Sequence, residues 1–405
     1  MVDLESIYRK TLEACAPEVI VRAAVDASMP RDVVAIGKCA GRMVSGVGYD
    51  RGFCVVPRGY PRPGPSLRLG MTLGGHPDID DDSFAAGDTI VEFVDQCNDV
   101  LFLISGGGSA CVEVPLPPFT RDEVATTSAR LVASSLSIGE INTVRKHLSA
   151  IKGGRLGARV HGRSVTLVYS DVSTGAIGDV ASAPTVADRT TNADAARILE
   201  RLGGCEAIVA RLRDPSTPDT VRRLDNAIAR VIADNATLTS AAARFVREAG
   251  LVAVMWPGQI ESDVDDAARD LAERAATLNE NEVLIAGGEP VVARHGTGKG
   301  GRCCELAVRF AMRRDNVALF GTSDGVDGSS GVAGISVEAH FSAPAAQDRG
   351  LKPAATQKQI LELLANSDSL AAALRIGRAV IMPPTGNNLR DLFLVAGVNP
   401  RMAHH

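Results

Sequence analysis

The chain has 405 residues, of which 45% are hydrophobic and 22% charged, and its formal net charge is −5. This length exceeds one ordinary domain, and the composition is that of a well-buried globular protein rather than a disordered one. The acidic balance argues against nucleic acid as a general partner. Because the eight cysteines contain no C-x-x-C pair and no apolar run approaches about 18 residues, we expect a reduced, cytoplasmic protein that does not enter a membrane.

The first half of the chain alternates short apolar runs with helical patterns. The runs Asp32–Gly37, Asp99–Ile104 and Ser164–Ser170 each end where polar or glycine residues gather. Their apolar residues are continuous rather than alternating, which predicts a parallel sheet covered on both faces. Ligands of such sheets bind beyond the carboxyl ends of the strands.

Three features stand at those strand ends. The second run passes into a loop made of Ser105, Gly106, Gly107, Gly108 and Ser109. Three consecutive glycines cost entropy on ordering, so the loop favours a bound anion, most often phosphate, over a plain tight turn. Lys38 can neutralise a phosphate, although a solvated surface lysine fits equally well. Asp171 can accept a hydroxyl proton or bind Mg²⁺, or it can simply cap the next turn.

The segment Ser137–Arg155 is dense in polar residues and predicts a helix that ends at Lys152-Gly-Gly. A solvated helix would explain its charge. The Lys-Gly-Gly-Arg termination favours a site for an anion instead. Candidate binding residues in this segment are Arg145, His147, Lys152 and Gly153.

A charged, proline-containing stretch over Arg211–Arg230 indicates a boundary, and a final unit begins near Asn281. Within it we expect three strands, at Glu282–Ala286, Pro290–Ala293 and Val317–Phe320, and one helix, at Cys304–Met312.

Two motifs of this last unit have competing interpretations. Gly296, Gly298 and Gly301 form a G-x-G-x-x-G pattern, which is typical of a dinucleotide fold but weak without a complete βαβ unit before it. Asp324 and Asp327 flank a glycine, and this arrangement suits Mg²⁺, a sugar hydroxyl or an ordinary turn.

Taken together and in this order, these segments resemble the glycerate 2-kinase family, the class II glycerate kinases, over nearly the whole chain. The resemblance is carried by Ile36-Gly-Lys-Cys-Ala40, Gly75-His-Pro77, Ser105-Gly-Gly-Gly-Ser-Ala110, Glu140–Ser149, Lys152-Gly-Gly-Arg155, Ser170-Asp-Val172, Pro184-Thr185 with Asp188, Gly287-Gly-Glu289, Gly300-Gly-Arg302, Glu305-Leu306, Asp324-Gly-Val-Asp-Gly328 and Ala333-Gly334.

The resemblance implies an α/β fold of two domains, a larger Rossmann-like parallel-sheet domain and a smaller α/β domain of the MOFRL type, with the active site in the cleft between them. The expected bounds are 1–225 for the first domain, 226–280 for a connecting α/β segment and 281–403 for the MOFRL-like domain.

The resemblance also implies ATP- and Mg²⁺-dependent phosphorylation of a small hydroxy acid, by default glycerate to 2-phosphoglycerate. A homodimer is one option for the assembly, and the oligomeric state stays open. By position, Lys38, Asp171 and Arg302 match residues that the family uses for catalysis. Nucleotide or phosphate contacts are expected at Ser105, Gly106, Gly107, Gly108, Ser109, Lys152 and Gly153. Substrate contacts are expected at Arg145, His147, Glu289, Asp324 and Asp327, while the metal ligands stay open.

The chain departs from the family within its motifs. Ser173-Thr-Gly-Ala176 stands where the family has Pro-Gly-Asp-Asp, and Cys303-Cys304 replaces an Asn-Gln pair. Ala183 and Asn387 also replace residues typical of the family. These changes suggest a different polyol, cyclitol or hydroxy acid as acceptor, or poor activity on glycerate. The Gly296–Gly301 pattern and the α/β alternation leave open an NAD-dependent oxidoreductase, and a non-catalytic binder that retains the fold is a third alternative.

Overall fold

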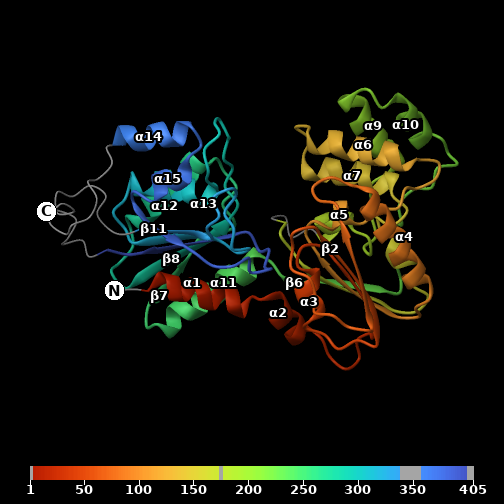
Figure 1. The fold of residues 1–405 in the computed structure, drawn as a ribbon, viewed down its shortest axis with the longest axis horizontal. Coiled ribbons are helices and arrows are strands. Elements are labelled where there is room, and N and C mark those ends of the chain that lie inside the picture. Colours follow the sequence, from red (N-terminus) through yellow and green to blue (C-terminus); the bar gives the residue numbers. More distant parts are fainter. Residues whose placement is uncertain (1–2, 173–176, 338–356, 399–405) are drawn as a thin grey trace. The chain divides into compact units, whose positions relative to one another are not determined.

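The computed structural model describes residues 3–172, 177–337 and 357–398, and its contacts divide the chain into two compact units (Figure 1). We call Pro17–Asp234 the parallel-sheet unit, and Met1–Ala16 together with Asn235–His405 the mixed-sheet unit. These bounds differ from the expected ones, because the N-terminal helix and most of the connecting segment make their contacts within the mixed-sheet unit.

The parallel-sheet unit is built on six strands that pair in the order β3-β2-β1-β4-β5-β6, every pair parallel. This is the Rossmann strand order, and it confirms the expected fold class. The strands are β1 (Asp32–Ile36), β2 (Arg51–Pro57), β3 (Leu69–Gly74), β4 (Val100–Ser105), β5 (Ser164–Tyr169) and β6 (Ala227–Ala233).

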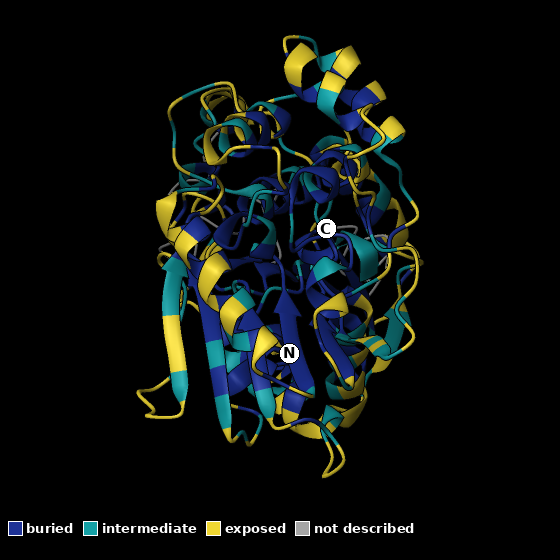
Figure 2. Ribbon diagram, turned by 90° about the vertical axis from the view of Figure 1, so that its right-hand side faces the viewer, coloured by how far each residue is buried: buried dark blue, intermediate teal, exposed yellow. Residues whose placement is uncertain are grey.

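The continuous apolar strands are buried on both faces, as their sequences predict. Every residue of β4 and of β5 is buried, and Figure 2 shows strands that are dark blue along most of their length beneath helices with yellow outer faces. The helical segments are α2 (Pro17–Ala24), α3 (Ala40–Val44), α4 (Asp81–Asp95), α5 (Gly108–Cys111), α6 (Arg121–Val132), α7 (Ile138–Leu148), α8 (Arg155–Ala158), η1 (Ile177–Ser182), α9 (Asn192–Leu202) and α10 (Glu206–Leu212).

Helix α7 is shorter than expected. It begins with a capping box between Ser137 and Glu140, and it ends at Leu148 rather than at Lys152. Ser149 has extended backbone and forms a bridge with Pro115, and its hydroxyl binds Glu113, so the chain leaves the helix four residues early.

The mixed-sheet unit contains a second six-stranded sheet in the order β11-β10-β9-β12-β8-β7, in which only the β7–β8 pair is parallel. The strands are β7 (Val252–Met255), β8 (Glu282–Gly288), β9 (Ala318–Thr322), β10 (Gly334–Val337), β11 (Gly377–Val380) and β12 (Asp391–Ala396). The expected strand at Pro290–Ala293 is wrong, because that segment makes only an isolated bridge between Val291 and Asp263.

Helices lie on both faces of this sheet (Figure 1). On one face are α1 (Leu4–Ala14) and α11 (Asn235–Glu248), which pack on each other and on the strands. On the other are α12 (Val264–Ala275), α13 (Arg302–Ala311), α14 (Gln357–Ala365) and α15 (Ser369–Ala373). Among the described helices of both units, none is long and apolar enough to cross a membrane.

Candidate active site

The glycine loop of the parallel-sheet unit packs against the end of β1. The backbone N–H of Lys38 donates to the carbonyl of Gly106 at 2.9 Å, and the N–H of Cys39 donates to Ser105 Oγ at 3.0 Å. Gly37 adopts a φ of +116°, and a Cβ atom there would stand 2.4 Å from the carbonyl oxygen of Ser105. The ends of β1 and β4 therefore approach each other closely, and only a glycine at position 37 leaves room for this contact.

Three side chains converge on this loop. A Cβ atom on Gly106 would stand 1.9 Å from Oδ2 of Asp171, and one on Gly107 would stand 2.9 Å from Lys38 Cγ and 3.3 Å from His76 Cδ2. The structure thus brings Lys38 and Asp171 to the same loop, as the strand-end argument predicts. The residues Ser173–Ala176, which come soon after Asp171, lie outside the described residues.

His76 is a member of this group that sequence reasoning did not select, although Gly75-His-Pro77 was among the motifs of the resemblance. Its ring meets the Tyr60 ring edge-on, with 6.1 Å between the two ring centres. Lys38 Nζ lies 5.6 Å from the centre of the same Tyr60 ring. The residue is exposed at the surface, but desolvation of the ring by its neighbours, and then the charges of Lys38 and Arg145, lower the pKa of His76 to about 4. At neutral pH the ring is therefore a neutral hydrogen-bonding group.

The end of the loop at Ser109 is held by a series of hydrogen-bonded side chains. Ser109 Oγ lies 2.8 Å from Ser182 Oγ, which donates to Asn142 Oδ1 at 2.8 Å. Ala181, Ser182 and Ala183 all adopt a left-handed backbone, with φ between 52° and 57°. Consecutive non-glycine residues in this region are strained, and such strain is typical of functional sites.

Most polar residues of α7 serve the fold rather than the site, which corrects the expectation for His147. His147 is completely buried, and its two ring nitrogens lie 2.7 Å from Asn192 Oδ1 and 3.1 Å from Thr190 Oγ1. A ring engaged on both sides has no nitrogen left for a substrate. Arg145 is different: Ser128 holds its guanidinium at 2.9 Å, and its charge acts on His76.

Lys152 and Gly153 are also structural, contrary to the expected phosphate contact. Lys152 Nζ is buried, where it donates to Glu113 Oε2 at 2.5 Å and to the carbonyl of Val112 at 3.0 Å. The N–H of Gly153 donates to the carbonyl of Ser182. This lysine therefore neutralises a buried carboxylate of its own fold rather than an incoming anion.

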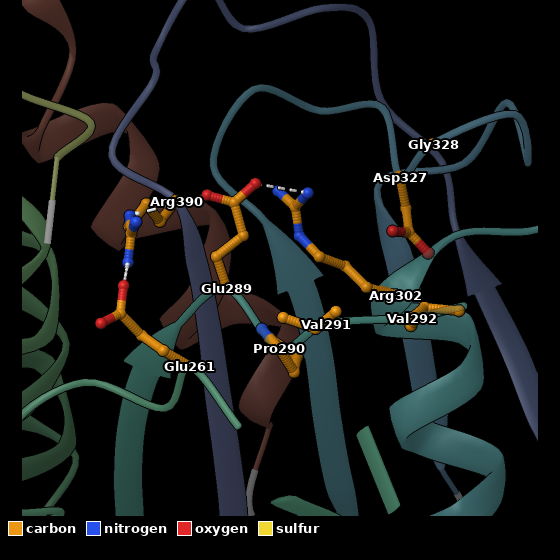
Figure 3. Close-up of a pocket in the computed structure, with 9 residues that line it drawn as sticks. All are labelled: Glu261, Glu289, Pro290, Val291, Val292, Arg302, Asp327, Gly328 and Arg390. Atoms are coloured by element: carbon orange, nitrogen blue, oxygen red, sulfur yellow. Dashed lines mark hydrogen bonds and ion pairs between the residues drawn. The ribbon is translucent and has the colours of Figure 1, made fainter. Parts of the chain in front are cut away.

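The mixed-sheet unit contains a pocket of about 550 Å³ at the ends of its strands. Figure 3 shows its charged residues: Arg302 pairs with Glu289 at 2.7 Å, and Arg390 with Glu261 at 2.6 Å. Arg390 Nε also lies 3.6 Å from Glu289, so this carboxylate stands between two guanidinium groups. Arg302 and Glu289 thus share one pocket, as expected for residues of a common site.

Asp324 and Asp327 have local partners. Asp324 Oδ1 accepts hydrogen bonds from Thr322 Oγ1 and the N–H of Val326, which is the pattern of an ordinary turn. Asp327 accepts from the N–H groups of Cys303 and Cys304 at 3.1 and 2.8 Å, so it caps α13 while it lines the pocket. Burial raises the pKa of Asp327.

The two thiols that replace the family's amides face the core. Cys303 and Cys304 are completely buried among the apolar side chains of the mixed-sheet unit, and burial raises the pKa of both. They are therefore inert packing residues rather than reactive ones. The departure removes two amides from the motif but places no thiol in the pocket.

The G-x-G-x-x-G loop is filled by the chain itself. Cβ atoms on Gly296, Gly298 and Gly300 would stand 2.4, 2.5 and 1.9 Å from atoms of Asn366, Asp368 and Ser369. The N–H of Gly298 donates to the carbonyl of Asn366, and that of Gly301 to Ser369 Oγ. These glycines allow close packing of two chain segments, and the loop offers no cradle for a dinucleotide pyrophosphate.

Within residues 3–172, 177–337 and 357–398, no three histidine, cysteine or acidic side chains gather as a metal site. Mg²⁺ that enters with a nucleotide needs only one or two protein carboxylates, because phosphate oxygens and water complete its coordination. Asp171, at the glycine loop, fits that requirement.

Comparisons with known proteins cover the whole architecture. Residues 3–214 match a family described as a domain of unknown function, DUF4147, and residues 282–391 match the MOFRL family. The chain is 32% identical to the D-glycerate 2-kinase of Thermotoga maritima over 96% of both chains. It is 30% identical to the glycerate 2-kinase of Pyrococcus horikoshii, over 91% of this chain and 88% of that one.

A protein of Agrobacterium vitis, whose name proposes a hydroxypyruvate reductase, is 32% identical over 96% of this chain and 94% of its own. Among solved structures, a glycerate kinase from Thermotoga maritima matches with a TM-score of 0.86 and 32% identity, covering 97% of this chain and 98% of that one. A protein from Pyrococcus horikoshii matches with a TM-score of 0.81 and 26% identity, covering 98% and 99%.

Proposed function

The chain belongs to the glycerate 2-kinase family, and on that premise we propose that it transfers the terminal phosphoryl group of ATP to a hydroxyl of glycerate, giving 2-phosphoglycerate. The observation that carries the proposal is the convergence of Lys38, His76 and Asp171 on the Ser105–Ser109 loop. A flexible cation, a neutral imidazole and a carboxylate around bare backbone suit phosphoryl transfer, which depends mainly on positioning and charge neutralisation.

In the proposed reaction the acceptor oxygen forms a bond to the γ-phosphorus while the bond from that phosphorus to the bridging oxygen breaks, and ADP leaves. Asp171 takes the hydroxyl proton or orients the hydroxyl. Lys38 neutralises charge on the phosphoryl oxygens, and the loop N–H groups bind phosphate or acceptor oxygens. Asp171, which lies against this loop, would be the carboxylate that holds Mg²⁺ bound to the nucleotide, and the ion would neutralise charge on the phosphates.

Arginines bind the anionic groups of the substrates. Arg302 is fixed in its pocket and carries further N–H donors in a planar fork, which matches a carboxylate or phosphate. Arg145 lies close enough to His76 to influence its protonation, and it offers a second cation for an anionic group at the glycine loop.

The related protein from Agrobacterium vitis raises a second candidate, reduction of a 2-oxo acid by a nicotinamide cofactor. The chain offers less support for this reaction, because Asn366, Asp368 and Asp327 of the chain itself fill the space at the three glycines that would form a dinucleotide motif.

A substrate screen separates these candidates. The protein is incubated with ATP, Mg²⁺ and a series of hydroxy acids and polyols, and products are identified by phosphorus NMR. In parallel, hydroxypyruvate and NADH are followed by absorbance. We expect 2-phosphoglycerate as the principal product. A faster transfer to another acceptor would reassign the substrate, and NADH oxidation without any phosphoryl transfer would contradict the kinase.

A further inference from the structure

Asp391 holds a position in the second sheet that fixes its side chain. It is the first residue of β12, where it pairs with Gly288 at the end of β8 and Thr322 at the end of β9. It is completely buried. Its Oδ2 accepts a hydrogen bond from Arg302 Nε at 2.6 Å, and its Oδ1 accepts one from Arg302 Nη2 at 3.2 Å.

This contact uses one particular edge of the guanidinium. The group is planar and carries five N–H donors in a rigid fork. Asp391 takes the edge made by Nε and Nη2, which fixes both the plane of the group and its direction. Nη1 then reaches Glu289 on the pocket wall at 2.7 Å. Arg302 is therefore held from the sheet side, and its remaining donors are at the pocket.

We propose that Asp391 is a positioning residue for the kinase reaction, which orients Arg302 so that its outer N–H groups meet an anionic group of the substrates. The proposal rests on the proposed function. Asp391 does not itself contact a substrate, because it is shielded from solvent behind Arg302. Its effect on the reaction passes through the guanidinium alone.

A neutral replacement separates this role from a structural one. Burial raises the pKa of Asp391 while the ion pair with Arg302 lowers it, so a neutral side chain of the same size removes the desolvation cost of the carboxylate at this position. Asp391→Asn keeps the size of the side chain but offers a single acceptor oxygen, and its NH₂ group faces the donors of Arg302. We therefore expect the variant to fold and to lose the two-point hold on Arg302.

The experiment is a double-mutant cycle measured as kcat/KM for glycerate with saturating ATP. Asp391→Asn is expected to lower kcat/KM by about 10- to 100-fold, since small misplacements of a binding group cost this much. In the Arg302→Ala background, the same substitution is expected to change kcat/KM by less than about 2-fold, because the residue through which it acts is gone.

Glu305 provides the matched control. It is a buried carboxylate on the same helix as Arg302, but it pairs with Arg309, at 2.7 Å, rather than with Arg302. Glu305→Gln removes a buried carboxylate charge from the helix that carries Arg302, and we expect kcat/KM within about 2-fold of wild type.

The outcomes are distinct. Wild-type kcat/KM in Asp391→Asn, or an equal loss in the wild-type and Arg302→Ala backgrounds, would overturn the positioning role while the kinase activity stands. An inactive wild-type protein would overturn the proposed function together with this inference. If Asp391→Asn does not fold, Asp391→Glu takes its place: it keeps the charge and displaces the carboxylate by one methylene, and full activity in it would overturn the proposal.

Discussion

The carboxylate of Asp171 lies directly against the backbone of Gly106, so that a Cβ atom on this glycine would stand 1.9 Å from Asp171 Oδ2. The two residues come after β5 and β4, which are neighbours in the sheet. Parallel pairing of β4 and β5 thus places the carboxylate that follows one strand against the glycine loop that follows the other. Gly106 is required there for space, whereas Gly107 is required for its φ of +81°.

Gly106→Ala should therefore damage catalysis. The added methyl group must displace Asp171 or the loop, and we expect kcat/KM to fall by about 100-fold or more. Gly139→Ala is the control, because nothing lies within 4 Å of a Cβ atom at Gly139 on α7. That variant should keep wild-type activity and gain about 0.5 kcal/mol of unfolding free energy. A fully active Gly106→Ala protein would show that the contact has no catalytic importance.

His76 should titrate at low pH. Its pKa is lowered from 6.5 to about 4, so the unfolded chain binds the proton more readily than the folded protein between these values. The free energy of unfolding should then fall as the pH is lowered from 6.5 towards 4. In His76→Asn, the part of this pH dependence that comes from the imidazole should be absent. The ring is followed by NMR in the wild-type protein, and a titration at or above pH 6.5 would contradict the assignment.

Replacing Lys152 should cost stability rather than nucleotide affinity. Lys152→Met leaves Glu113 buried without its cation, and we expect a loss of about 3–5 kcal/mol in the free energy of unfolding by urea. The double variant with Glu113→Gln should recover part of that loss. A large rise in the KM for ATP with unchanged stability would instead restore Lys152 as a phosphate contact.

Ala183 sits in a strained backbone that glycine would relieve. Its φ is +53°, and Ala183→Gly is expected to stabilise the protein by about 0.5–1 kcal/mol because glycine adopts this conformation without a clash. Ala129 is the control, because it lies exposed within α6, where the same substitution should destabilise by a similar amount. A lower free energy of unfolding in Ala183→Gly would show that the backbone at this position is not strained.

The strand-end residues of the first sheet could be predicted from sequence, because a parallel strand that is buried on both faces consists of consecutive apolar residues. Val100–Ser105 and Ser164–Tyr169 are nearly uninterrupted apolar runs, and the residues just after each run must stand at the same edge of the sheet. Lys38 and Asp171 were found in this way. His76 was not selected, because the edge strand before it, β3, is half exposed and carries no such apolar run.

The polar residues of α7 and the turn after it show where that reasoning fails. Sequence gives the density of charge but not the partners: Asp188 for Lys146, Asn192 for His147 and Glu113 for Lys152 all come from other segments. The Gly296–Gly301 loop fails for the same reason, since the chain that fills it lies about 70 residues away in sequence. The close approach of two segments and the close approach of a ligand require the same glycines.

The role of the glycine loop in phosphoryl transfer is tested by the rate of ATP-dependent phosphorylation of glycerate, measured for the wild-type protein and for Lys38→Met. Lys10→Met is the control for loss of an exposed lysine. We expect the wild type and Lys10→Met to form 2-phosphoglycerate at equal rates. Lys38→Met should remain folded and be slower by about 100-fold or more. Equal rates in the folded Lys38→Met protein, or no phosphoryl transfer by the wild type, would contradict the role of the glycine loop in phosphoryl transfer.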